Sequence, residues 1–168
     1  LGVNFIDTAH SYGTEEAVGE GIKGVTRDDV VISTKYHPAW DGKIHSNETI
    51  IAGLNESLQR LDLEYVDIFH LHGVHPKYYS YVMEDVVPAL RKEQDKGKFR
   101  HLGITELATV DPGHEVLMRA ADEDCFDVFM VAFHLLHQTA RRALFPLTQD
   151  RGIGTLIMFA VRTLFSEP

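Results

Sequence analysis

The stretch Val3-Asn4-Phe5-Ile6-Asp7-Thr8-Ala9-His10-Ser11-Tyr12-Gly13 decides the fold. Its apolar first half has the composition of a short β-strand, and this run stops abruptly at Asp7. Tyr12 follows five positions after Asp7. The stretch therefore predicts a strand that delivers two ionisable side chains to one end of a sheet.

The composition predicts one soluble globular unit over residues 1–168. The chain is 44% hydrophobic and 24% charged, which is enough to bury a sizeable core. No apolar run approaches the roughly 18 residues that a membrane span needs. A formal net charge of −9 without a basic block argues against a nucleic acid or an anionic membrane as the partner. The single cysteine, Cys125, cannot form an internal disulfide and indicates a reducing compartment, the cytoplasm.

Short β-branched or aromatic runs alternate with helical patterns along the chain. The expected strands are Val3–Ile6, Val30–Thr34, Val66–Leu71, Arg100–Ile104, Val128–Phe133 and Thr155–Phe159. The expected helices are Thr14–Lys23, a helix capped by Ser46 with the stripe Ile50, Leu54, Leu58 and Leu61, Tyr81–Lys96 interrupted at Pro88, Gly113–Asp122, and Thr139–Asp150 interrupted at Pro146. This alternation predicts a parallel sheet covered by helices, either a (β/α) barrel or a doubly wound sheet.

Ionisable residues fall at the ends of successive predicted strands. Asp7 and Tyr12 follow the first strand, Lys35 the second and His72 the third. In a parallel barrel these ends form one face, where such folds place their chemistry. A doubly wound sheet usually has a Gly-rich loop after its first strand, and no G-x-G-x-x-G occurs here. The pattern therefore favours the barrel, with Asp7, Lys35 and His72 pointing inward.

Four segments, in order, resemble motifs of the aldo-keto reductase family. They are Asp7-Thr8-Ala9 with Tyr12-Gly13, Val31-Ile32-Ser33-Thr34-Lys35, Leu61-x-Leu63-x-Tyr65-Val66-Asp67-Ile68-Phe69-x-Leu71-His72, and the stretch from Gly97 to Thr105. The resemblance covers essentially the whole chain. It implies an NAD(P)H-dependent reductase of aldehydes or ketones on an eight-stranded barrel.

The resemblance assigns a chemical role to each strand-end residue. Hydride reaching a carbonyl carbon leaves an alkoxide that needs a proton, which Tyr12 would supply as general acid. Lys35 would lower the pKa of the Tyr12 phenol, and Asp7 would hold Lys35 in place. His72 would orient or polarise the carbonyl of a small-molecule substrate.

Cofactor contacts implied by the resemblance depart in part from the family pattern. Thr105-Glu106 stands where many members present Ser-Asn to the nicotinamide carboxamide, Met130 where a glutamine often follows, and Met158 where an aromatic is common. With Asp7, these residues are the expected cofactor contacts, although Glu106 has no amide donor and Met130 makes only weak polar contacts. NADP is the expected cofactor, with NAD as the alternative.

Two other functions compete with the reductase. His70 and His72 share one strand face and His75 lies close in sequence, as in metal-dependent barrel hydrolases, with His134 and His137 as weaker candidates. The altered cofactor positions are also typical of a redox-inactive or regulatory barrel that retains the nucleotide.

The visible strands correspond to the second through seventh of the family barrel, so we expect the first and last strands to lie outside this sequence. The sequence leaves the substrate and the oligomeric state open. Candidate pocket residues are Tyr36, Trp40, Tyr78 and Tyr79.

Overall fold

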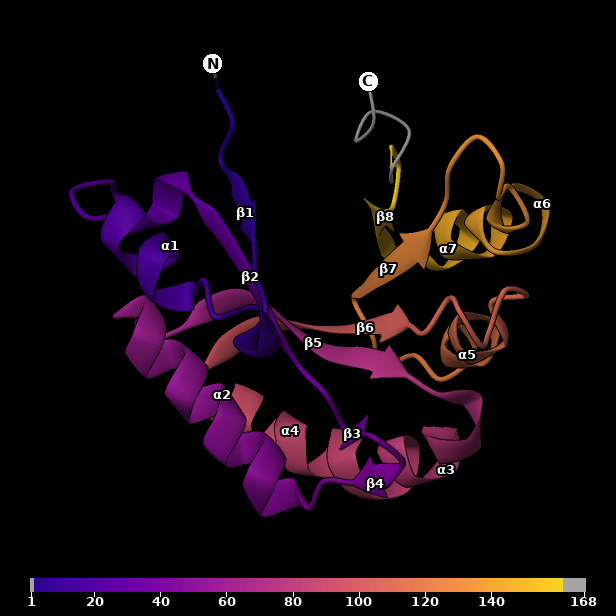
Figure 1. Ribbon diagram of the computed structural model, residues 1–168, viewed down its shortest axis with the longest axis horizontal. Coiled ribbons are helices and arrows are strands. Elements are labelled where there is room, and N and C mark those ends of the chain that lie inside the picture. Colours follow the sequence, from indigo (N-terminus) through magenta and orange to yellow (C-terminus); the bar gives the residue numbers. More distant parts are fainter. Residues whose placement is uncertain (1, 162–168) are drawn as a thin grey trace.

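The computed structural model describes residues 2–161. A curled parallel sheet organises the chain, and its strands pair in the order in which they occur in the sequence (Figure 1). These strands are β1 (Phe5–Asp7), β2 (Val31–Tyr36), β5 (Val66–Val74), β6 (Phe99–Glu106), β7 (Val128–Ala132) and β8 (Gly154–Met158). The predicted barrel class, with six strands present, is confirmed, and each strand lies within a few residues of its predicted range.

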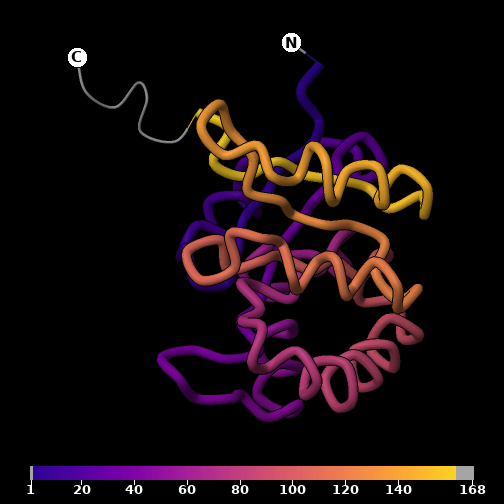
Figure 2. Tube along the Cα trace, turned by 90° about the vertical axis from the view of Figure 1, so that its right-hand side faces the viewer, coloured from indigo at the N-terminus to yellow at the C-terminus, as the bar shows by residue number. Residues whose placement is uncertain are grey.

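Helices cover the outer, convex side of the sheet (Figure 1). They are α1 (Glu15–Gly21), α2 (Asn47–Leu61), α3 (Tyr79–Tyr81), α4 (Val87–Asp95), α5 (Glu115–Ala120), α6 (Ala140–Ala143) and α7 (Phe145–Arg151). Short 3-10 turns span His10–Tyr12, Arg27–Asp29 and Pro76–Tyr78. In the view turned by 90°, the first residues of the chain and β8 lie at the same end of the molecule (Figure 2). No helix within residues 2–161 has both the length and the apolarity to cross a bilayer.

The helix α2 forms as its sequence predicts. The Ser46 hydroxyl accepts a hydrogen bond from the backbone N–H of Thr49, which satisfies one of the free donors of the first turn. The predicted stripe of four hydrophobic residues, at helical spacing, is buried against the sheet. By contrast, Thr14 precedes α1 without capping it, because its hydroxyl pairs with that of Thr8 at 2.8 Å.

Both prolines inside predicted helices mark breaks. Pro88 lies in the first turn of α4, directly after a π-helical turn at Val82–Val86, so the segment predicted as one helix changes its winding there. Pro146 lies in the first turn of α7, and the separate helix α6 ends before it. Proline lacks the N–H and crowds the preceding turn, so each proline lies where the α-helical hydrogen bonding changes, after the π turn for Pro88 and after α6 for Pro146.

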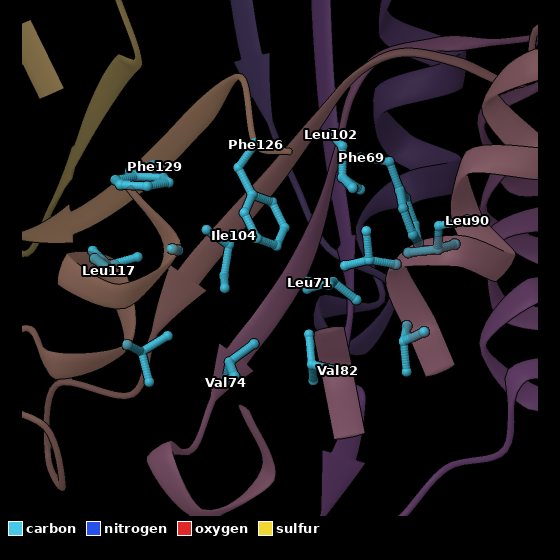
Figure 3. Close-up of a cluster of buried hydrophobic side chains, with 14 of the residues drawn as sticks. Phe69, Leu71, Val74, Val82, Leu90, Leu102, Ile104, Leu117, Phe126 and Phe129 are labelled. Atoms are coloured by element: carbon cyan, nitrogen blue, oxygen red, sulfur yellow. The ribbon is translucent and has the colours of Figure 1, made fainter. Parts of the chain in front are cut away.

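The main hydrophobic core fills the space between the outer face of the sheet and the helices. Alternate strand residues, Phe69 and Leu71 on β5 and Leu102 and Ile104 on β6, point toward the helices, where residues such as Leu90 meet them (Figure 3). The residues between them point to the opposite, inner face. This alternation follows from the two-residue period of a strand, and it confirms the predicted inward direction of Lys35 and its neighbour Ser33.

An ion-pair network lies at the N-terminal end of the strands, opposite the strand ends that carry the predicted site. The Asp67 carboxylate accepts hydrogen bonds from Arg27 at 2.7 Å, from Arg100 at 3.0 Å and from the backbone N–H of Ile32 at 2.8 Å. Both guanidinium groups also lie over the ring of Tyr65. Because the network joins three strands or their flanks, we assign it to stability.

Candidate active site

The site begins with an ion pair between Asp7, an exposed residue at the end of β1, and the buried Lys35 of β2. The register places Asp7 opposite Ser33, whose hydroxyl donates to Asp7 Oδ1 at 2.7 Å. Lys35 Nζ donates to Asp7 Oδ2 at 2.7 Å and to the backbone carbonyl of Thr8 at 2.6 Å. The Lys35 side chain is completely buried, and this burial lowers the pKa of its ammonium while Asp7 acts in the opposite direction. Asp7 therefore holds Lys35 as predicted.

The tyrosine reaches this pair through a tight 3-10 turn. The Tyr12 N–H donates to the Ala9 carbonyl at 2.9 Å, and Gly13 follows with a φ of 68°, a conformation that glycine adopts without strain. Lys35 Nζ lies 5.0 Å from the centroid of the Tyr12 ring. The Tyr12 side chain is still 53% exposed, so its phenol can meet a ligand from solvent.

The predicted lowering of the Tyr12 pKa is wrong in direction. Burial and the charge of Asp7 together raise the pKa of the Tyr12 phenol above its ordinary value. Lys35 stands within the range at which a cation favours phenolate, but its charge is already paired with Asp7. A phenol of ordinary pKa is already protonated at neutral pH, so the upward shift makes Tyr12 a weaker acid than the sequence predicts.

His72 completes the group from the end of β5. Its imidazole meets the Tyr12 ring edge to face, with centroids 5.7 Å apart, and stacks on His37 at 4.0 Å. Burial, reinforced by His37 and Lys35, lowers the pKa of His72 to about 3. Burial likewise lowers the pKa of His70 to about 3. His72 is therefore neutral at physiological pH, and all four predicted residues meet at one end of the sheet.

Two of the predicted cofactor residues lie side by side on the inner face. The register pairs Thr105 of β6 with Met130 of β7, and Met130 is almost fully buried. The Thr105 hydroxyl oxygen accepts a hydrogen bond from the backbone N–H of Gly73 at 2.6 Å. Its own proton remains available to a ligand. Met158 lies opposite Ala132, at the end of β8, and is half-buried.

Glu106 points away from this group into a buried network. Glu106 Oε1 accepts from the backbone N–H of Ala132, and Oε2 lies 2.7 Å from His114 Nδ1. The other nitrogen of His114 lies 2.7 Å from the Thr139 hydroxyl. Protein donors thus occupy both carboxylate oxygens of Glu106, and its cofactor role stays a prediction. Sequence reasoning missed His114, which carries no motif and has a positive φ of 61°.

A cavity of about 410 Å³ opens next to His37 and Gly73. Part of its wall is a hairpin that the sequence did not predict, formed by β3 (Ala39–Trp40) and β4 (Lys43–Ile44). The Tyr78 hydroxyl donates a hydrogen bond to the Gly42 carbonyl of this hairpin at 2.8 Å. Its lining residues include His37, Trp40, His75, Lys77, Tyr78 and Leu107.

Not all predicted pocket residues reach this cavity. Trp40 and Tyr78 line it as expected. Tyr36 instead lines a smaller neighbouring cavity of about 190 Å³. Tyr79 is only 1% exposed and packs in the core beneath Arg119, because it opens a helix whose inner side faces the sheet.

The other histidines do not gather into a metal site. Within residues 2–161, no three His, Cys, Asp or Glu side chains are placed to hold a metal ion. His134 and His137 bond to each other through their backbones and line a separate cavity of about 410 Å³.

Known proteins of similar sequence cover almost this whole chain. L-galactose dehydrogenase of Arabidopsis thaliana is 32% identical over 161 residues, 93% of this chain and 50% of that protein. NADH-specific methylglyoxal reductase of Escherichia coli (strain K12) is 29% identical over 170 residues, 90% of this chain and 50% of that protein. The chain thus spans about half the length of these curated relatives.

Solved structures share the fold. An aldo/keto reductase from Klebsiella pneumoniae in complex with NADP and acetate matches with a TM-score of 0.74 and 28% identity, covering 99% of this chain and 58% of that one. An aldo/keto reductase from Brucella melitensis matches with a TM-score of 0.76 and 26% identity, covering 99% and 62%. A sequence profile described as "Aldo/keto reductase family" matches residues 1–166. The chain therefore belongs to the aldo/keto reductase family.

Proposed function

We propose that the protein containing this chain reduces aldehyde or ketone carbonyls to alcohols, with NADP as the cofactor and NAD as the alternative. The observation that carries the proposal is the meeting of Asp7, Lys35, Tyr12 and His72 at one end of the sheet. The NADP complex of the similar Klebsiella protein supports the choice of cofactor. The nicotinamide would supply the hydride.

The residues divide the chemistry of the carbonyl oxygen between them. The Tyr12 phenol is protonated at neutral pH and is a stronger acid than the alcohol that forms, so it can donate its proton to the developing alkoxide even with a raised pKa. Lys35 Nζ lies 5.0 Å from the centroid of the Tyr12 ring and would favour the tyrosinate that results, although its ion pair with Asp7 offsets part of this effect. His72 is neutral and meets Tyr12 edge to face, a position from which it would orient the carbonyl.

Thr105 fits the nicotinamide carboxamide best among the predicted cofactor residues. Its oxygen is occupied by Gly73, which leaves the hydroxyl proton as a donor, and the neighbouring Met130 supplies an apolar wall. Met158 extends this wall at the end of β8, and Asp7 acts through Lys35. Glu106 would contribute only if a ligand displaced one of its present donors.

The cavity lined by His37 and Gly73 would hold the remainder of the substrate. Its walls include the rings of Trp40, Tyr78 and His37, which suit a flat or ring-shaped group. The Lys77 ammonium lies 4.6 Å from the centroid of the Tyr78 ring and offers one positive charge at the cavity wall. A small carbonyl compound with such a ring is therefore the proposed substrate class.

The test compares tyrosine variants of the full-length protein. Tyr12→Phe should lower NADPH-dependent carbonyl reduction by about 10²- to 10⁴-fold, the range for a lost general acid, while NADPH still binds. Tyr65→Phe, at the opposite end of the strands, is the matched control and should retain activity. Near-normal turnover by Tyr12→Phe would reject the proposal.

Two further measurements separate the alternatives. Activity should survive exhaustive chelation, because hydride transfer from a nicotinamide needs no Lewis acid. Loss of activity on chelation, restored by zinc, would favour the metal-dependent hydrolase. NADPH binding without turnover of any carbonyl compound would favour the redox-inactive barrel. The observation behind this alternative is that Glu106 and Met130 differ from the family pattern at positions expected to contact the cofactor.

A further inference from the structure

The peptide that joins His72 to Gly73 lies at an irregularity of β5. The pairing with β6 shifts between Leu71 and Val74, since these residues lie opposite Ile104 and Glu106. β5 therefore has one more residue than its partner across this interval, and Gly73 has a φ of 62°. Such a bulge redirects the side chain next to it. Here it brings the His72 imidazole against the Tyr12 ring.

Side chains from both neighbouring strands hold this peptide. The His37 Nδ1–H, just beyond β2, donates to the carbonyl of His72 at 2.9 Å. On the other side, the Gly73 N–H donates to the Thr105 hydroxyl oxygen of β6 at 2.6 Å. Both polar groups of one peptide unit are thus bonded, and we call this arrangement of His37, Thr105 and the His72–Gly73 peptide the peptide clamp.

His37 also contacts the imidazole of His72, the side chain that the bulge redirects. The imidazoles of His37 and His72 are nearly parallel, with centroids 4.0 Å apart and an interplanar angle of 17°. His72 Nδ1 is buried and has no hydrogen-bond partner within residues 2–161. No bond at that nitrogen fixes the ring, and the stack on His37 and the edge contact with Tyr12 restrain it instead.

His37 is itself fixed from several sides. Its carbonyl accepts from His45 Nδ1 at 2.9 Å, and its ring packs against Trp40 with centroids 4.5 Å apart. Because Nδ1 donates to a carbonyl, Nε2 is the unprotonated nitrogen, and it lies 3.5 Å from the Ser11 hydroxyl. Burial lowers the pKa of His37, so it remains neutral beside His72.

We propose that His37 is the positioning residue of the site: it holds the His72 ring in the orientation that meets the substrate carbonyl. The inference rests on the proposed function of His72, but the placement of the ring can be measured without turnover. His37 also lines both the cavity of about 410 Å³ and the smaller cavity of about 190 Å³.

The kinetic test uses three variants of the full-length protein. His37→Ala removes both the bond and the stack, and kcat for carbonyl reduction should fall by roughly 10- to 100-fold, as small misplacements of a reacting group do. The KM for NADPH should stay within about twofold, because His37 acts on the carbonyl side of the site. His37→Phe keeps a stacking ring and should give an intermediate kcat. Ser11→Ala, the matched control, removes only the contact at Nε2 and should leave kcat unchanged.

The second readout is the NMR contact between the ring protons of His72 and Tyr12. This contact should be present in the unmodified protein, be lost in His37→Ala and persist in His37→Phe. The phenylalanine variant retains the ring volume, so it keeps the test decisive if the alanine variant folds poorly. An unchanged kcat or an unchanged His72–Tyr12 contact in His37→Ala would overturn the proposal. Should Tyr12→Phe prove fully active, the reductase proposal fails, yet the NMR comparison still decides whether His37 positions His72.

Discussion

Glu106 and His114 form a fully buried pair, with Glu106 Oε2 2.7 Å from His114 Nδ1. The pair joins the end of β6 to the segment before α5, and Thr139 extends it to α6. A buried carboxylate is tolerated because each oxygen has a donor. The network thus links the loops that follow two neighbouring strands, β6 and β7, at the end of the sheet where the proposed active-site residues meet.

Glu106→Gln should destabilise the protein. The two oxygens of Glu106 face His114 Nδ1 and the backbone N–H of Ala132, and glutamine turns its amide N–H₂ toward one of these two groups. An unsatisfied buried polar group costs about 1 to 3 kcal/mol. The free energy of unfolding, from guanidinium titration, should fall by this amount. Glu115→Gln, on the exposed side of α5, is the control and should change it by less than about 0.5 kcal/mol. A loss of NADPH affinity with unchanged stability would instead place Glu106 in the cofactor site.

Stability should decrease as the pH falls below 6.5, in part through His70. Burial lowers the pKa of His70 from 6.5 to about 3. Between these values the unfolded chain binds a proton that the native protein does not, so unfolding becomes easier at lower pH by about 1.4 kcal/mol per pH unit for each such histidine. His72 behaves in the same way.

The contribution of His70 can be isolated by comparing unfolding free energies at pH 7 and pH 5. His70→Leu removes one of the three histidines whose pKa burial lowers, His37, His70 and His72, and should reduce the difference between these pH values. His101→Leu, at an exposed position of β6, should leave the difference as it is in the unmodified protein. An undiminished pH dependence in His70→Leu would show that His70 does not contribute.

Residues 1–168 produced alone should associate and should not reduce carbonyls efficiently. Within the described residues, β1 pairs only with β2 and β8 only with β7, so each leaves one edge of backbone donors and acceptors open. Such edges invite pairing with another chain, and Val3 at the start of the chain is already 82% exposed. Size-exclusion chromatography with an NADPH oxidation assay would measure both properties. A stable, active monomer would contradict this expectation.

The sequence by itself predicted parallel strands in chain order and four polar residues gathered at one end of them, and the structure brings these four residues together. Apolar runs that end at Asp7, Lys35 and His72 are local signals, and the two-residue period fixes which side chains share a face. Parallel pairing in chain order then brings these three strand ends together. The same period places His37 on the side of Lys35, a signal from which its role could have been inferred.

Only the tertiary structure decided the pKa shifts of these residues and the partners that position their side chains. The direction of the Tyr12 pKa shift depends on burial and on the pairing of Lys35 with Asp7, neither of which is a property of a short segment. The bulge before Gly73 depends on the register between β5 and β6. Likewise, Glu106 finds His114 only after α5 has packed on the sheet. Residue type and spacing are encoded locally, whereas desolvation, register and the choice of hydrogen-bond partner arise from contacts between distant segments.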